Sequence, residues 1–105
     1  MEDEARSFDP ETRPFDSALV LDTPEAIEEY LVDAFESEDP AVISHALGVV
    51  ARAKGMTQLA EETGLARPAL YRALSSEGNP EFSTIIKVAH ALGFKLSPQR
   101  VAEPA

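Results

Sequence analysis

The sequence predicts an all-α protein of five helices that follows an acidic N-terminal segment. Three observations lead to this fold class. Helix start signals recur along the chain, apolar residues recur between them at helical spacing, and a glycine turn joins two short helices within residues 56–74. With 105 residues and no cysteine, the chain can bury one modest core without disulfides or thiolate-bound zinc.

The first part of the chain divides into a tail and an acidic extension. Residues 1–14 are polar, acidic and contain two prolines, so we expect them to be disordered in isolation. Residues 15–38 include the first helix, with Thr23 as N-cap and Pro24 at its first position. One apolar stripe is expected along this helix, formed by Ile27, Tyr30, Leu31, Ala34 and Phe35.

A second helix starts at Asp39-Pro40, again a cap followed by a first-turn proline. Gly55 is expected to end it. Apolar residues cover much of its circumference, which predicts a central position; they are Val42, Ile43, Ala46, Leu47, Val49, Val50 and Ala53. This helix opens a predicted DNA-binding domain over residues 39–97.

Residues 56–74 fit a helix-turn-helix. Ala60 falls where the first helix of the pair faces the second, and Gly64 falls in the turn, where a positive φ is easiest without a Cβ. The apolar side chains expected to hold the pair together are Leu59, Leu65, Leu70 and Ala73. A hairpin of two helices that binds only protein is the alternative interpretation.

The second helix of the pair carries the residues expected to read DNA. Arg67, Tyr71 and Arg72 are four and five positions apart, so they share one exposed stripe. Arginine can bind guanine O6 and N7 in the major groove, and tyrosine can contact a thymine methyl group or a phosphate. This stripe therefore predicts a base-reading surface.

A loop and a last helix follow. Ser75 and Asn79 lie in the loop, where they either bind phosphate or only form the turn. Ser83 is expected to cap a final helix that ends at Gly93, with its apolar positions at Ile85, Ile86, Val88, Ala89 and Leu92. Residues 94–96 alternate between apolar and polar as a short strand would, but three residues are too few to decide between a strand and a loop. Residues 98–105 are expected to fray.

Charge is distributed unevenly along the chain. Residues 1–45 hold 14 acidic residues against two arginines, a net charge of −12, whereas residues 46–105 have a net charge of +2. The acidic part would repel DNA, and it would attract a basic protein. The alternative is that these acids only keep the protein soluble.

Other function classes find no support in the sequence. The acidic N-terminus and the absence of a long apolar run argue against secretion and membrane spanning, so a cytoplasmic protein is expected. His45 and His90 have no acid or thiolate at repeating ligand spacing, and no catalytic set or phosphate-binding glycine loop is present. We therefore expect neither an enzyme nor a bound metal or cofactor.

The order of the helices and the residues of the reading pair resemble the phage-repressor-like (Cro/C1, XRE) helix-turn-helix domain. Within that group, several segments are similar to addiction module antidote proteins, a HigA-like group of antitoxins, over about residues 13–97. These segments are Arg13-Pro14-Phe15-Asp16, Tyr30-Leu31, Asp39-Pro40, Ala51 to Ala60, Leu70-Tyr71 and Gly78-Asn79-Pro80.

The resemblance implies an antitoxin that dimerises on operator DNA to repress its own operon and that neutralises a co-encoded basic toxin of the RelE/ParE fold. By position it implies DNA contacts from Gln58, Arg67, Tyr71 and Arg72. Pro68 in the first turn of the reading helix, and Ser75 and Asn79 in the loop after it, complete the candidate DNA-binding residues. The acidic third would bind the toxin through Phe15, Leu19, Leu21, Glu28, Glu29, Tyr30, Asp33 and Glu36.

One residue departs from the family pattern. Ala66 stands where a serine usually caps the reading helix, which should cost about 0.5–2 kcal/mol, and Pro68 offsets part of this by fixing φ. Two alternatives to the antitoxin stay open: a solitary repressor without a toxin, and a protein-interaction module that never binds DNA.

Overall fold

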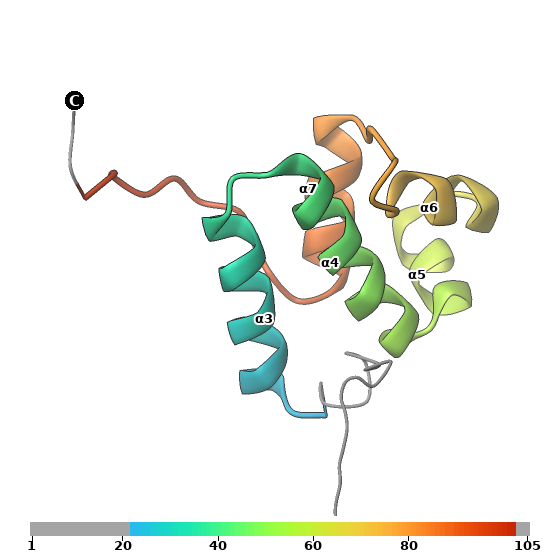
Figure 1. Ribbon diagram of the computed structural model, residues 1–105. Coiled ribbons are helices and arrows are strands. Elements are labelled where there is room, and N and C mark those ends of the chain that lie inside the picture. The colour runs from blue at the N-terminus through green and yellow to red at the C-terminus, as the bar shows by residue number, and fades with distance from the viewer. Residues whose placement is uncertain (1–21, 103–105) are drawn as a thin grey trace, which may run out of the picture.

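The computed structural model describes residues 22–102 as five α-helices (Figure 1). No strand occurs within this range, so the all-α prediction is confirmed for it, and residues 94–96 remain extended without pairing. The expected tail over residues 1–14, together with Phe15, Leu19 and Leu21, lies outside the described residues. The helices are α3 (Pro24–Glu36), α4 (Pro40–Lys54), α5 (Met56–Thr63), α6 (Arg67–Ala73) and α7 (Phe82–Ala91).

Helices α3 and α4 begin where their caps predict. The Thr23 hydroxyl accepts a hydrogen bond from the Ala26 N–H at 3.1 Å, and the Asp39 carboxylate accepts one from the Ala41 N–H at 3.0 Å. A proline follows each cap. Each side chain satisfies a backbone donor that the first helical turn leaves without a partner, so both helices start at a defined residue.

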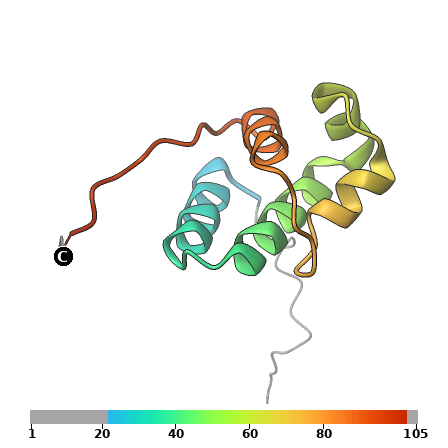
Figure 2. The ribbon, with the colours of Figure 1, turned by 90° about the horizontal axis from the view of Figure 1, so that it is seen from above.

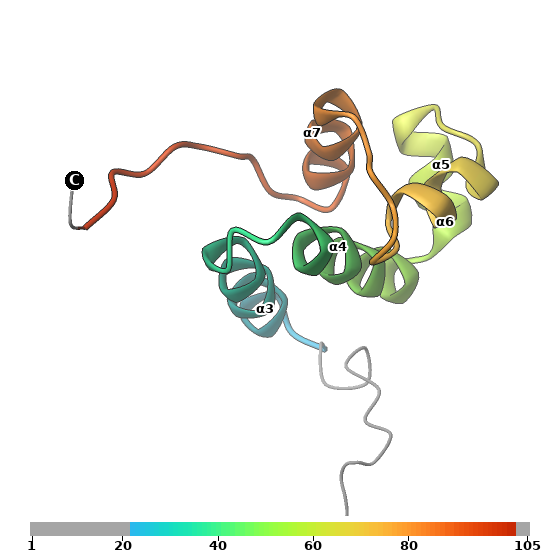
Figure 3. The same cartoon turned by 45° about the horizontal axis from the view of Figure 1, so that its top comes forward.

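Helix α4 is central, as its apolar circumference predicts. Seven of its residues are buried, against two in α3, which packs chiefly on α4 through Leu31 and Ala34. Val42 and Ala53 are exposed, although they were expected on the apolar surface of α4. Figures 2 and 3 show α4 with α3 on one side and α5 and α6 on the other.

Gly48 lets the end of α6 approach α4 closely. A Cβ built on Gly48 would overlap the carbonyl oxygen of Leu74, which follows α6. A glycine in a helix interior weakens the helix by roughly 0.5–1 kcal/mol relative to alanine, so this position gives up helix stability to allow a main-chain contact. No local pattern in the sequence predicts this contact.

Helices α5 and α6 are joined by a short turn that begins at Gly64. Gly64 has φ 75°, in the left-handed region, and its N–H donates to the Ala60 carbonyl at 2.9 Å. The predicted role of this glycine is confirmed. Leu59 and Leu70 are fully buried between the helices, while Leu65, Ala60 and Ala73 are half-buried, so the expected apolar contact holds the pair together.

Helix α7 starts one residue before the position expected of its cap, so the assignment of Ser83 is wrong. Glu81 precedes the helix, and its carbonyl accepts hydrogen bonds from the N–H groups of Thr84 and Ile85, which places Ser83 inside the first turn. Val88 and Ala89 are buried, and α7 packs on α5. After α7, the extended residues 94–102 run away from the helices past α3 (Figure 1).

The buried residues form one core that draws on all five helices, including α3. None of the helices within residues 22–102 has the length and apolar character needed to cross a membrane.

Candidate nucleic-acid interface

Helix α6 presents two different faces. Leu70, and Leu74 just after the helix, are fully buried, whereas Arg67, Tyr71 and Arg72 are exposed. Pro68 is exposed in the first turn, and no side chain caps the helix at Ala66, as expected. The structure therefore brings the predicted stripe together on the outer surface of α6, with the apolar side chains behind it.

The Arg67 side chain reaches from α6 to the start of α5. Its Nη1 donates to the Thr57 hydroxyl at 2.9 Å. A guanidinium has five N–H donors in a planar fork, so this bond orients the group and leaves further donors available. Thr57 thus belongs to the candidate interface, and because it lies ten residues before Arg67, no local sequence pattern predicts this contact.

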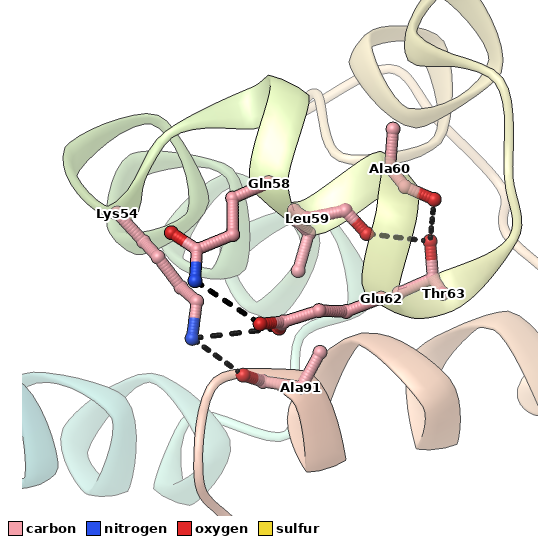
Figure 4. A network of polar contacts seen from close by, with 7 residues as sticks. All are labelled: Lys54, Gln58, Leu59, Ala60, Glu62, Thr63 and Ala91. Carbon is pink, nitrogen blue, oxygen red and sulfur yellow. Dashed lines mark hydrogen bonds and ion pairs between the residues drawn. The ribbon is translucent and has the colours of Figure 1, made fainter.

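Gln58 faces a carboxylate on its own helix (Figure 4). Its amide donates to Glu62 at 3.1 Å, and Glu62 also forms an ion pair with Lys54 at 3.6 Å. The Lys54 ammonium donates to the Ala91 carbonyl at 2.8 Å, so it links the ends of α4 and α7 to α5. A phosphate that approached Gln58 would have to compete with the Glu62 carboxylate.

The two loop residues differ in their surroundings. Ser75 is half-buried and its hydroxyl donates to the Arg72 carbonyl at 3.1 Å, which favours the turn-forming interpretation, although its oxygen can still accept. Asn79 is exposed. Gly78 passes so close to the end of α6 that a Cβ would overlap the Ala73 carbonyl oxygen. The loop is therefore held against α6 and presents Asn79 beside it.

Charge separates along the described residues. Residues 22–39 hold eight acidic residues and no basic one, while α6 carries two arginines and no acid. Within residues 22–102 the only ion pair joins Lys54 and Glu62. Figures 1 and 3 show α3 and α6 on opposite sides of α4, so the acidic and the basic surfaces face different directions.

The residues expected to bind a toxin lie mainly on the exposed surface of α3. Glu28, Glu29, Asp33 and Glu36 are exposed. Tyr30 is half-buried and packs against the core, so part of its ring already has a structural role. Phe15, Leu19 and Leu21 lie outside the described residues.

Comparisons with known proteins identify the family. A family model described as "probable addiction module antidote protein" matches residues 11–100. An uncharacterized protein from Haemophilus influenzae is 40% identical over 88 residues, which are 84% of this chain and 91% of that protein. No solved structure matches the chain. Since the family model covers most of its length, the chain belongs to the family of probable addiction module antidote proteins, which implies an antitoxin role and a toxin partner of some kind.

Proposed function

We propose that this protein is an antitoxin that represses its own operon by binding operator DNA as a dimer. The helices α5 and α6 serve as a helix-turn-helix of the Cro/C1 type, with α6 in the major groove. The surface of α3 binds a co-encoded basic toxin of the RelE/ParE fold, in the cytoplasm. Regulation by binding, without an enzymatic step, is the activity expected of an antidote.

One observation carries the DNA-binding half of this proposal. Arg67, Tyr71 and Arg72 are exposed on α6 while Leu70 is buried behind them, and the Arg67–Thr57 bond connects the stripe to α5. A recognition helix needs polar side chains that reach base edges and an apolar face that fixes its angle. Helix α6 has both.

Dimerisation is proposed because one reading helix with two arginines makes few base and phosphate contacts. Two copies double them and read two half-sites about 34 Å apart. Footprinting of the full chain on its own promoter should show paired half-sites. The binding constant should fall with salt by a log–log slope of roughly −4 to −7 if five to eight phosphates are neutralised. A single half-site at saturation, or a flat salt response, contradicts this half of the proposal.

The toxin-binding half is supported by the exposed acids of α3. Deleting residues 1–38 would be a poor test, because it removes Leu31 and Ala34 from the core. Converting exposed acids to the matching amides keeps the shape of α3 and removes only charge. The association rate with the co-encoded toxin should then fall and become less sensitive to salt. An unchanged association rate would mean that these acids only keep the protein soluble. The four acids to be replaced are Glu28, Glu29, Asp33 and Glu36.

A further inference from the structure

An open groove lies between α3, α7 and the extended residues 94–99. Its walls include Leu31 and Phe35 of α3, Leu47 of α4 and Ala89 of α7. Leu31, Leu47 and Ala89 also belong to the buried core, so the floor of the groove is apolar and continuous with the protein interior. The extended residues 94–99 close one side of it.

Three large apolar side chains are exposed around this groove. Phe82 is 73% exposed, Val32 is 49% exposed and Ile86 is 40% exposed. Single exposed apolar residues are common on protein surfaces and need no explanation. Here, three such side chains from two helices surround one apolar groove. Covering them with the apolar surface of a partner would remove them from water, which is favourable. Ile86 is one of the apolar positions predicted for the last helix, whereas Phe82 is not among them.

The edge of the groove is acidic. Glu28, Glu36 and Glu38 line it and are exposed, with Lys95 as the basic residue of the lining. These carboxylates would repel the phosphates of DNA. Two copies of this same face would also bring like charges together, which opposes a symmetric dimer through it. The occupant that fits combines apolar side chains with lysine or arginine.

We propose that this groove binds a basic amphipathic segment of the toxin, an inference that rests on the proposed antitoxin function. Apolar side chains of that segment seat on Phe82, Ile86 and Val32. Its basic side chains face Glu28 and Glu36. The toxin surface of the antidote therefore includes α7 as well as the acidic N-terminal third.

The first test measures binding of the full chain to the purified product of the reading frame next to its gene. Phe82→Ala combined with Ile86→Ala should raise Kd at least about 10-fold, because truncating the central apolar contacts of an interface removes most of its affinity. The control is Val42→Ala, which removes an exposed apolar side chain from α4 outside the groove and should leave Kd unchanged. Circular dichroism and operator binding should match wild type in both variants.

A second comparison separates the groove from the general charge of α3. Glu28→Gln with Glu36→Gln removes two charges from the groove edge, and Glu29→Gln with Asp33→Asn removes two charges from the same helix outside it. The first pair should raise Kd about 10-fold more than the second, because its carboxylates line the groove, whereas Glu29 and Asp33 lie outside the groove and attract the toxin from farther away. Equal effects of the two pairs would overturn the groove as the binding site.

The outcomes distinguish this inference from the proposed function. If wild type binds the neighbouring protein and the Phe82/Ile86 variant binds it equally well, the groove inference is wrong and the antitoxin function stands. If wild type does not bind that protein, the antitoxin proposal itself fails. If the variant instead loses self-association in sedimentation and keeps its affinity for the neighbouring protein, a second copy occupies the groove and the inference is overturned.

Discussion

Replacing Gly48 by alanine tests whether the main chain of α4 holds the end of α6 in place. The added Cβ would overlap the Leu74 carbonyl oxygen and lie 3.3 Å from its carbon. Both atoms are main chain, so a side-chain rotation cannot relieve the contact. Either α4 or the end of α6 has to move, and Leu74 is itself fully buried in the core.

The magnitude follows from two opposing effects. Overpacking a well-packed interior costs about 1–3 kcal/mol, and a backbone clash belongs in the upper part of that range. Alanine returns up to about 1 kcal/mol through its higher helix propensity. We therefore expect Gly48→Ala to lower the free energy of unfolding by about 1–2 kcal/mol. For a domain of this size, that lowers Tm by roughly 5–15 °C.

Urea and thermal unfolding of the full chain, followed by circular dichroism, measure this effect. The control is Ala53→Gly at an exposed position of α4, which reports helix propensity alone and should cost at most about 1 kcal/mol. If Gly48→Ala proves as stable as wild type or more stable, helix propensity dominates and the close approach is not what this glycine provides.

Three further substitutions address the reading pair and its support. Arg72→Ala should weaken operator binding by about 1–3 kcal/mol in titrations and relax sequence preference, because a contact to a base is lost. Its Tm should be unchanged, since Arg72 is exposed. Equal operator affinity would show that Arg72 does not belong to the interface. Ala60→Glu should lower stability by about 1–3 kcal/mol, since it places a charge in a half-buried helix contact, and unchanged urea unfolding would show that the site is solvated. Lys54→Met should cost about 1 kcal/mol, because it removes the hydrogen bond to the Ala91 carbonyl and the ion pair with Glu62. It should also raise amide exchange at the end of α7, and unchanged exchange would show that Lys54 does not hold that end in place.

Local signals predicted the helix boundaries well. Thr23 and Asp39 cap their helices as expected, and Gly64 makes the turn, because each acts on backbone groups within a few residues. The prediction for Ser83 was wrong although serine suits a cap position. The carbonyl of Glu81, two residues earlier, already accepts the first hydrogen bonds of α7. A residue type permits a cap without requiring one.

Contacts between distant residues were beyond sequence reasoning. Gly48 meets Leu74 and Arg67 meets Thr57 only because α4, α5 and α6 fold against one another. The exposed stripe on α6 followed from helical periodicity, so its orientation could be predicted. The exposed Phe82 could not, because its apolar character suggests burial and only the tertiary packing leaves it open.

The attachment of α3 has a consequence for the lifetime of the chain. With two buried residues and one main neighbour, α3 should open locally at a lower free energy than α4, before the molecule unfolds globally. A ligand that binds only the closed form makes the open form rarer, and the effect grows with the ratio of the ligand concentration to its Kd. A toxin segment bridging α3 and α7 would act in this way. The free antidote would then expose a protease-sensitive helix, and the bound toxin would protect the protein that inhibits it.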